Sequence, residues 1–458
     1  MTSNDRPGTL TESTVELLQT MIRNRCVNDG SVASGEEVRN ADTLSAYLGG
    51  SGSGIDIARY ESVPGRVSLV ARIEGSDPAA PSLCLCGHTD VVPVEADGWS
   101  RDPFAGERVT GDDGSDEVWG RGAVDMLNLT ASMAVAMRHV AVSSDRLRGD
   151  LVFLAVADEE AGSTYGARWM AEHHAADITT DYVLCENGGI HAGTPDEPRI
   201  SINTAEKGVA WRRLRIRGVP GHGSMPFRAD NALVTAAGVV TRLAEYRPAP
   251  RLHELWRERV DTLGVDDDVR EALLDPDRLD EVLETLPTSA GAAHLHACSH
   301  TTVSPNVVQG NGMKTNVIPG TVDVDFDVRT MPGEGPDEVD AHLRAALGDL
   351  YDRVEVSPIM NDSASISPAA TPLWDSIQRA VEVPFPGARL SAQVTVGFTD
   401  NRIFRELGAV AYGAGLLSPS LDAGEFGRRF HGNDERIDVE SLGLTTDLWV
   451  RVINDFLG

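Results

Sequence analysis

The segment Leu83-Cys84-Leu85-Cys86-Gly87-His88-Thr89-Asp90 is an apolar run of strand length that ends in a His-x-Asp pair. Side chains two apart on an extended chain point to the same side, so His88 and Asp90 are expected to share a face. His88 can then bind a metal ion while Asp90 supports its ring, an arrangement common among metal-binding histidines. A buried histidine with a purely structural role fits the same segment, and for the segment alone we favour that interpretation.

Similar apolar strands recur on both sides of this segment and alternate with helical segments. The strands are expected at residues 67–73, 83–86, 151–156 and 182–185, and the helices at residues 129–139 and 166–173. This alternation predicts an α/β domain with a mostly parallel sheet. Its first helix is expected to begin at Ser13, with Glu16 closing a capping box.

Other points of the chain place acidic residues where a strand or turn ends. Asp125 is at the tip of a glycine-rich turn, while Asp158-Glu159-Glu160 and Glu186 each follow an apolar strand. Acids at the carboxyl ends of such strands lie where sites form in α/β sheets. Two plainer interpretations stay open, a helix N-cap for Asp125 and a solvated acidic turn for residues 158–160. His431 stands alone in a polar, glycine-containing segment far along the chain.

The pattern changes after residue 205. Residues 210–217 alternate between arginines and apolar residues, which is typical of an antiparallel strand with one face in solvent. Further segments follow in this order: a helix at 232–246, a charged helical stretch at 251–286, an alternating strand at 317–329, a helix at 337–350 and a strand at 354–356. The α/β character returns after residue 362 and ends in a helix at 441–456. We therefore predict one α/β domain from residues 1–205 and 361–458, with an α+β domain inserted at residues 206–360.

The order of the candidate ligands is more specific than any single motif. Strand or turn ends deliver His, Asp, Glu-Glu and Glu, and a His-Gly-x-x-Glu motif at residues 431–435 follows the insertion. Over residues 80–440 this combination resembles the di-zinc metallopeptidase/aminoacylase superfamily. That superfamily includes aminoacylase, glutamate carboxypeptidase, acetylornithine deacetylase and succinyl-diaminopimelate desuccinylase. The resemblance implies a catalytic domain of zinc-exopeptidase type and an inserted lid/dimerisation domain.

The resemblance also implies two divalent metal ions bridged by the carboxylate of Asp125. His88 and Glu186 complete the coordination of one ion, and Glu160 and His431 complete that of the other. Mixed nitrogen and oxygen donors with an open position for water suit zinc, while cobalt and manganese fit the same donors. The charges support this set independently, since two Zn²⁺ ions balance three carboxylates and one bridging hydroxide.

The groups that move or support protons follow from the same resemblance. Glu159 is the implied general base, which takes a proton from water and gives it to the leaving amine. Asp90 is implied to orient His88, and the peptide bond between Asp125 and Met126 is expected to be cis.

Looser matches indicate substrate-binding residues. His222 matches a lid histidine that stabilises the oxyanion and, in dimeric members, reaches the partner subunit's site. Asn316 matches a second lid motif, and Gly397 and Thr399 match a Gly-x-Thr/Ser-Asp substrate loop. Arg329 matches an arginine that binds a substrate carboxylate, although an exposed strand arginine is an equally good interpretation. The lid can form a homodimer, and its extra length at residues 251–286 can also replace a partner.

A second cluster combines histidine and cysteine. His294, His296, Cys298 and His300 alternate and are expected to share one face of a strand. A second metal site there is the less favoured interpretation, because short His/Cys tracts are only compositional evidence. The pair at positions 84 and 86 is interpreted as buried core rather than as thiolate ligands, because the carboxylates already fill both metal sites.

Composition restricts the partners and the compartment. The 458-residue chain has a formal net charge of −30, which disfavours nucleic acid and anionic membrane surfaces, because both attract basic patches. No apolar run approaches the length of a membrane span, and the polar first residues contain no signal-like segment. Five cysteines are few and odd in number for this length, which predicts a reducing compartment, so a cytoplasmic protein is expected.

The leading hypothesis of function is metal-dependent hydrolysis of the amide bond in a short peptide or N-acyl amino acid. The alternatives are a deacetylase or desuccinylase acting on a biosynthetic intermediate, and a non-catalytic relative that binds a metal or ligand. A cysteine hydrolase using Cys86 or Cys185 is disfavoured because the sequence has no His–Cys signature. Peptidases and deacylases share the same metal chemistry, so the sequence does not choose between them.

Overall fold

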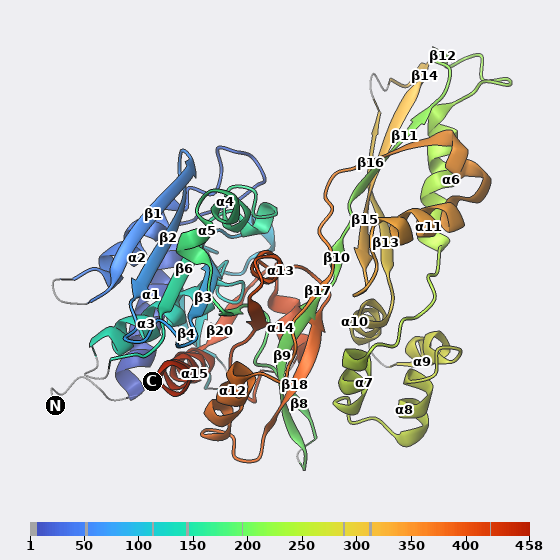
Figure 1. Cartoon of the computed structure of the whole chain (residues 1–458). Helices are drawn as coiled ribbons and strands as arrows, with labels where there is room; N and C mark the ends of the chain where they lie inside the picture. The colour runs from blue at the N-terminus through green and yellow to red at the C-terminus, as the bar shows by residue number, and fades with distance from the viewer. Residues whose placement is uncertain are drawn as a thin grey trace.

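The computed structural model describes residues 7–50, 54–111, 114–142, 146–194, 196–286, 289–310, 314–421 and 423–458. These residues form a larger α/β domain, which holds the first and the last of the described helices, and a narrower domain that extends away from it (Figure 1). The chain leaves the larger domain between β9 (Pro198–Glu206) and β10 (Gly208–Val209). It returns before β17 (Ser365–Ile366), which pairs with β9.

A mixed sheet forms the centre of the larger domain. Within the described residues its main order is β1 (Asp56–Val63), β2 (Arg66–Ile73), β6 (Leu151–Val156), β3 (Leu83–His88), β7 (Tyr182–Cys185), β19 (Val410–Gly413), β9 and β17. β8 (His191–Gly193) and β18 (Arg389–Thr395) also pair with β9. The four central strands, from β6 to β19, are parallel, as the alternation of strands and helices predicted. The β1 and β2 strands join one edge in antiparallel pairing.

Helices cover both faces of this sheet, because its strands are apolar on both sides. One face packs against α1 (Pro7–Arg23), α3 (Leu127–Val142) and α15 (Val439–Leu457), and the other against α4 (Ala167–His173) and α13 (Asn401–Glu406). Alternate residues of β3 divide between the two cores. Leu83 and Leu85 pack on the first face and Cys84 and Cys86 on the second, so the two cysteines are core residues as expected.

The narrower domain is built on an antiparallel sheet. It contains β10, β11 (Arg212–Arg217), β13 (Thr302–Gly310), β15 (Thr321–Thr330) and β16 (Val354–Pro358). Its buried face packs under α6 (Ala232–Glu245) and α11 (Pro336–Leu347). On the other face, Arg213 and Arg215 form ion pairs with Asp325 and Asp323 across the β11–β15 ladder. Burial of one face alone accounts for the alternation predicted from the sequence.

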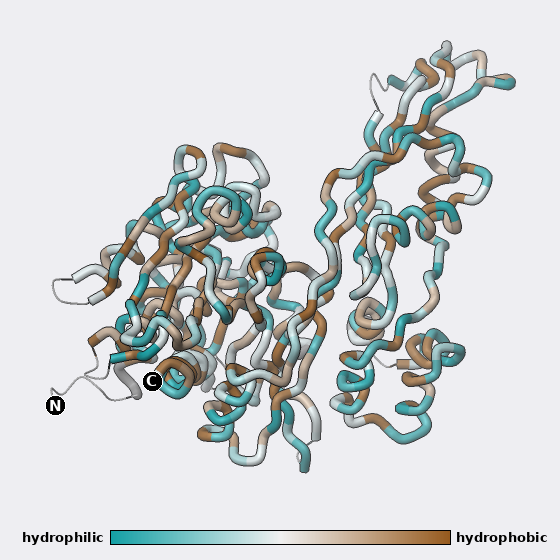
Figure 2. The backbone as a smooth tube through the Cα atoms, viewed as in Figure 1, coloured by the Kyte–Doolittle hydropathy of each residue, from teal (hydrophilic) through white to brown (hydrophobic). Residues whose placement is uncertain are grey.

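The charged stretch after residue 250 is helical, as expected. It forms α7 (Glu254–Asp261), α8 (Asp267–Leu273) and α9 (Leu279–Thr285), and α10 (Ser289–Ser299) follows. Buried residues of these helices, including Trp256 and Leu283, form one cluster with Ala205 of β9 and Val394 of β18. This helical extension therefore packs against the large sheet. It is mostly hydrophilic in Figure 2, whereas hydrophobic segments are more frequent among the central strands of the larger domain.

Three local expectations were wrong. The α1 helix already runs from Pro7, so Ser13 and Glu16 lie inside the helix instead of at its start. The expected strand 317–329 divides into β14 (Val317–Ile318) and β15, because the proline at 319 cannot donate to a strand ladder. Residues 294–299 lie on α10, not on a strand, since the alanine-rich segment has a strong helix propensity.

None of the described helices is long and apolar enough to cross a membrane. The longest of them, α15, instead packs against α1, α3 and α12 (Pro372–Glu382). Its apolar residues therefore belong to the core of the larger domain.

Candidate metal centre and catalytic site

The five predicted metal ligands come together at one edge of the large sheet. His88 is the last residue of β3, Glu160 lies in the short turn η2 (Glu159–Ala161) after β6, and Glu186 follows β7. Asp125 precedes α3, and His431 lies between α14 (Ala423–Arg429) and β20 (Arg436–Asp438). Parallel strands bring their carboxyl ends to the same edge, which is where open α/β sheets form their sites.

The carboxylate of Asp125 lies between two histidines. Its Oδ1 atom is 3.2 Å from Nε2 of His88, and its Oδ2 atom is 2.9 Å from Nε2 of His431. Oε2 of Glu186 is 4.0 Å from Nε2 of His88, and Oε2 of Glu160 is 3.2 Å from Nε2 of His431. One oxygen of Asp125 therefore faces each half of the predicted ligand set, instead of the helix amides that an N-cap would contact.

The turn that carries Asp125 is fixed by a residue from the far end of the chain. Oε1 of Glu435 accepts hydrogen bonds from the backbone amides of Val124 at 2.7 Å and Asp125 at 3.1 Å. Its Oε2 accepts a 2.6 Å bond from Arg121, and both side chains are buried. The peptide bond from Asp125 to Met126 is cis, as the resemblance implied. Glu435 was not among the predicted site residues, because the sequence does not reveal this long-range contact.

Asp90 connects the histidine to the glutamate turn. Nδ1 of His88 is 3.0 Å from the carbonyl oxygen of Asp90 and 3.5 Å from its Oδ1 atom. The Asp90 carboxylate accepts hydrogen bonds from the backbone amides of Glu159 at 3.3 Å and Glu160 at 3.2 Å, and from Asn28 at 2.8 Å. A proton on Nδ1 of His88 leaves Nε2 available to a cation.

The acids that follow β6 are largely buried, so they do not form a solvated turn. Asp158 is 1% exposed and Glu159 is 5% exposed. Asp158 accepts hydrogen bonds from the Tyr165 amide at 2.8 Å and from Asn28 at 3.1 Å. The first of the three acids is thus held by the protein, which leaves the next two beside the histidines.

Burial and mutual repulsion shift the acids of this centre. Burial, followed by the charge of Asp125, raises the pKa of Glu186 well above its ordinary value and that of Glu160 to about 7. Burial also raises the pKa of Glu159 well above its ordinary value. Hydrogen bonds to Asp125 and Glu160 raise the pKa of His431 to about 10. Buried acids this close together require protons or cations at neutral pH.

The donor atoms fit divalent cations. Ligand atoms of His88, Asp125 and Glu160 lie within 4.8 Å of one another, as do those of His88, Glu159 and Glu186. Oε1 of Glu160 is buried and has no hydrogen-bond partner among the described residues, so its lone pairs are available to a cation. Imidazole nitrogens with carboxylate oxygens suit zinc and neighbouring divalent metals. By distance alone Glu159 belongs to this group, and only the resemblance separates it from the ligands.

Two buried residues near Glu159, Asp400 and Arg402, were not among the predicted site residues. Oδ1 of Asp400 accepts a 2.6 Å hydrogen bond from Ser163. Arg402 donates to the Thr399 carbonyl at 2.6 Å, and its positive charge opposes the rise in the pKa of Glu159. Arg402 is 2% exposed, and this burial of a charged residue is the signal that the sequence does not display.

The predicted substrate loop is turned partly inward. Thr399 is buried, and its amide and hydroxyl donate to Oε2 of Glu206 at 2.6 and 3.2 Å. Gly397 is half-buried. In this structure Thr399 therefore supports the loop through Glu206, and Gly397 lies closer to the surface.

Arg329 lies between the two domains. Its guanidinium carbon is 5.9 Å from the ring centroid of Trp211 in the narrower domain and 5.3 Å from that of Phe398 in the larger one. Nε is 2.9 Å from Asp327, whereas Nη1 is buried without a hydrogen-bond partner among the described residues. Arg329 is thus not the freely exposed arginine that the sequence left open.

His222 and Asn316 lie together at the outer tip of the narrower domain, well away from β3, β6 and β7 (Figure 1). β12 (Gly221–His222) pairs with β14, and the Gly223 amide donates to the Asn316 carbonyl at 2.8 Å. Both side chains are exposed, and Nδ1 of His222 is 2.8 Å from Oγ of Ser224. The structure does not bring these two residues to the metal centre of their own chain.

Comparison with known proteins extends over most of the chain. The sequence profile of peptidase family M20/M25/M40 matches residues 84–455. A probable carboxypeptidase S-like 2 of Dictyostelium discoideum is 25% identical over 403 residues, which cover 85% of this chain and 74% of that protein. A succinyl-diaminopimelate desuccinylase of Phenylobacterium zucineum is 26% identical over 386 residues, which cover 82% of this chain and 83% of that protein. Aminoacylase-1 of Homo sapiens is 25% identical over 408 residues, with 87% and 86% covered.

Solved structures share the fold at lower identity. The M20 family metallo-carboxypeptidase Sso-CP2 from Sulfolobus solfataricus matches with a TM-score of 0.71 and 16% identity, over 98% of this chain and 99% of that one. A dinuclear metal binding peptidase from the M20 family of Bacillus subtilis matches with a TM-score of 0.59 and 15% identity, over 97% and 99%. The chain belongs to peptidase family M20/M25/M40, a family of hydrolases.

Proposed function

We propose that this chain hydrolyses the amide bond of a short peptide or an N-acyl amino acid at a pair of divalent metal ions. The observation that carries the proposal is the position of Asp125, which directs one oxygen to His88 and the other to His431. A carboxylate with a different partner on each oxygen is suited to bridging two cations. Glu186 and Glu160 lie in the two halves and supply the remaining oxygen donors.

The proposed mechanism assigns proton transfer to Glu159. Two divalent ions bound by the ligand set would lower the pKa of water and polarise the amide carbonyl. Glu159 lies beside the ligands, with Oε2 4.0 Å from Nε2 of His88. It takes the proton of the attacking water and passes it to the nitrogen of the leaving amine. Its place beside the ligands lets the same carboxylate accept the proton in the first step and return it in the second.

We propose that Arg329 binds the free carboxylate of the substrate. Its Nη1 atom has an unused hydrogen-bond donor among the described residues, and the side chain lies where the two domains meet. A planar guanidinium can hold a carboxylate through two parallel hydrogen bonds. Peptides and N-acyl amino acids both carry such a carboxylate, so this contact supports either substrate class.

We further propose a homodimer in which the lid of one subunit completes the site of the other. His222 supports this arrangement because it is exposed at a tip that lies away from the metal centre of its own chain. Apolar side chains near that tip, including Met225 and Phe227, are also exposed, as expected at a surface that binds another protein. The free thiols of all five cysteines support a reducing, cytoplasmic location.

The proposal is tested by removing the metals and restoring them one at a time. Chelator-treated protein is expected to lose amine release from a panel of dipeptides, N-acetyl amino acids and N-succinyl amino acids. Zn²⁺ is expected to restore it, with Co²⁺ and Mn²⁺ as the other candidates, and the best substrate distinguishes peptidase from deacylase. No release across the panel, with metal bound at the His88 centre, would support the non-catalytic alternative.

A further inference from the structure

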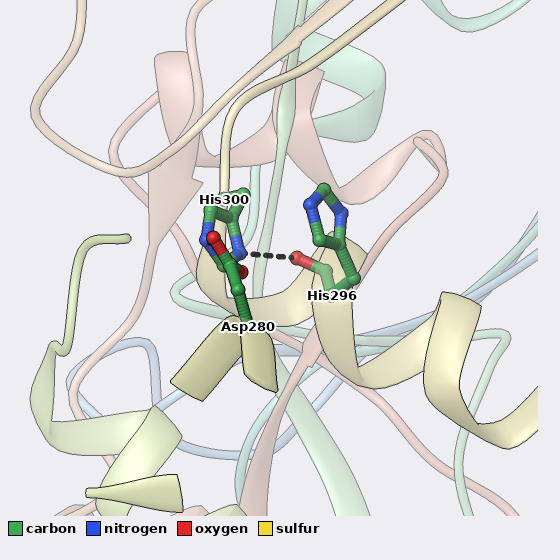
Figure 3. Close-up of side chains that lie close together, drawn as sticks. All are labelled: Asp280, His296 and His300. Atoms are coloured by element: carbon green, nitrogen blue, oxygen red, sulfur yellow. Dashed lines mark hydrogen bonds and ion pairs between the residues drawn. The ribbon is translucent and has the colours of Figure 1, made fainter. Parts of the chain in front are cut away.

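A second group of metal-binding side chains lies in the helical extension of the narrower domain, apart from the centre around Asp125. Asp280 is on α9, His296 is on α10, and His300 follows the last residue of α10. One ligand atom from each lies within 4.8 Å of the other two. Figure 3 shows Asp280 beside the imidazole of His300, with His296 next to them. We propose that these three residues bind one divalent ion of the zinc type.

The helix explains why only part of the His/Cys tract meets this acid. Residues four apart on a helix lie on the same face, so the tract divides into two pairs. Cys298 pairs with His294, whose Nε2 atom is 3.5 Å from the sulfur. The rings of His296 and His300 stack with centroids 4.1 Å apart and an angle of 3° between their planes. This second pair faces α9, and a rotation of the His296 ring out of the stack would let both imidazoles point at one ion, because a metal lies in the plane of each ring that binds it.

The hydrogen bonds of His300 leave one ring nitrogen without a donor. Its Nδ1 atom is 3.2 Å from the carbonyl oxygen of His296 and 2.9 Å from Oγ of Ser299. A carbonyl oxygen can only accept, so Nδ1 carries the proton and Nε2 carries a lone pair. A metal-binding histidine is commonly fixed in this way by a carbonyl behind its ring.

The lone pair on Nε2 of His300 lies close to another hydrogen-bond acceptor, Oδ1 of Asp280. The side chain is fully buried, and Nε2 makes no hydrogen bond of good geometry with the described residues. Oδ1 of Asp280 nevertheless lies 3.2 Å from it. Two acceptors at this distance repel unless a proton or a metal ion lies between them, and a buried polar group without a partner is costly. A divalent ion bound to both atoms removes the conflict.

The surroundings define the site further. Lys207 donates to the carbonyls of His300 at 2.6 Å and Ala297 at 2.9 Å, and it lies between β9 and β10 where the chain crosses between domains. This contact fixes the end of α10 at the domain junction. The side chain of Asp280 is 58% exposed, so an ion can enter from solvent. The bound ion would therefore tie α9 to α10 beside that junction.

Two imidazoles and one carboxylate select the class of ion. Nitrogen donors suit zinc, cobalt and related metals, whereas calcium and magnesium prefer sites made entirely of oxygen. Three protein ligands leave one position of a tetrahedral zinc for water. The Asp280/His296/His300 site requires no contribution from the catalytic residues, so it can be tested independently of the proposed reaction.

The site is tested by counting zinc in the full-length chain after removal and resupply of the metal. We expect three ions per chain in the unchanged protein and two in Asp280→Asn and His300→Gln, with amine release from the best substrate retained in each. His294→Gln is the matched control and keeps three. Equal zinc content and affinity in the control, Asp280→Asn and His300→Gln would overturn the site, whatever the activity of the catalytic centre.

A stability measurement supplies a second readout for Asp280→Asn, which changes an exposed side chain and does not endanger folding. The amide of the new asparagine can donate to Nε2 of His300. The metal-free variant should therefore melt at the same temperature as the metal-free unchanged protein or above it. Added Zn²⁺ should raise the melting temperature of the unchanged protein by more than that of the variant. The same zinc-induced rise in both would contradict the proposal.

Discussion

The metal centre and the tip of the narrower domain differ in how their side chains are held. At the centre, buried strand ends deliver His88 and Glu186, and Glu435 fixes the turn of Asp125 from the far end of the chain. At the tip, His222 ends the short strand β12, Asn316 lies in the turn just before β14, and both are exposed. The first region holds its side chains in place before any substrate arrives. The second region offers side chains that can act on substrate only when they are brought to a metal centre.

This difference indicates a division of labour. A buried set of charged residues is costly unless each member is paired, so the protein surrounds it with hydrogen bonds. An exposed histidine has no such burial cost, so it can remain on the surface of one subunit and act when a second subunit binds. Changes at the centre should therefore remove activity within one chain, whereas changes at the tip should be rescued by another chain.

The largest effect is expected for Glu159→Gln. The substitution keeps the shape of the side chain but removes the group that transfers protons. It should lower kcat by about 10²- to 10⁴-fold, the usual range for general acid–base catalysis. The metal content, measured by mass spectrometry, should stay that of the unchanged protein. Glu406→Gln, at an exposed carboxylate, is the control, and unchanged turnover in Glu159→Gln would remove the assigned base.

His222→Ala should lower kcat by about 10²- to 10³-fold, as expected for loss of an oxyanion donor. The side chain is exposed, so folding and metal content should not change. His173→Ala, at another exposed histidine, is the control.

Mixing experiments decide which chain His222 serves. When inactive Glu159→Gln and His222→Ala proteins are mixed equally and exchange subunits, half of the dimers are mixed. In each mixed dimer one site has both an intact Glu159 and a partner with an intact His222. Activity should then return to about one quarter of the unchanged protein, which follows from random pairing of subunits in a closed dimer. Absence of rescue, with mixed dimers verified, would place His222 at the site of its own chain or outside the reaction.

The two regions also show what the sequence can and cannot predict. His88 ends an apolar strand, Glu160 and Glu186 follow apolar strands, and parallel strands align their ends, so their convergence follows from local pattern and topology. Glu435 and Arg402 were missed because their importance depends on contacts across the fold and on burial. Neither contact leaves a periodic signal in the chain.

The His/Cys tract shows how a spacing can mislead. An alternating pattern fits a strand, but here the alanine-rich segment forms α10. The strand period of two would place all four residues of the tract on one face. The helix instead places His296 and His300 on one face. Asp280 could not be assigned to them before α9 and α10 were seen to pack together.

Glu435→Gln tests how far the metal centre depends on its supporting residues, because it weakens the support of the Asp125 turn and changes none of the predicted ligands. The variant leaves the buried charge of Arg121 without its carboxylate and weakens the support of the Asp125 turn. Metal affinity should fall by about 10- to 100-fold, the usual effect of losing a supporting residue. Titration with Zn²⁺ measures this change, and excess Zn²⁺ should restore most of the activity. Unchanged metal affinity would show that the Asp125 turn keeps its conformation without the carboxylate of Glu435.

The smallest effect on activity is expected for Glu334→Gln, a buried residue at the base of the narrower domain. Burial alone would raise its pKa, but hydrogen bonds from His342, Thr301, the Met331 amide and Arg251 outweigh burial and lower the pKa from an ordinary 4.5 to about 2. Because the folded pKa is lowered, the stabilisation is present above pH 4.5 and is lost as the pH falls towards 2. Its size at neutral pH is roughly 3 kcal/mol.

Unfolding by urea at several pH values checks this prediction. The unchanged protein should lose stability between pH 4.5 and pH 2 more steeply than Glu334→Gln, because the variant has no carboxylate to protonate there. Turnover at neutral pH should stay the same, since Glu334 lies in the network of Thr301 and Arg251 and not at the metal centre. Parallel pH profiles in the two proteins would show that this network adds no stability. A loss of turnover would show instead that the base of the narrower domain controls how the two regions meet.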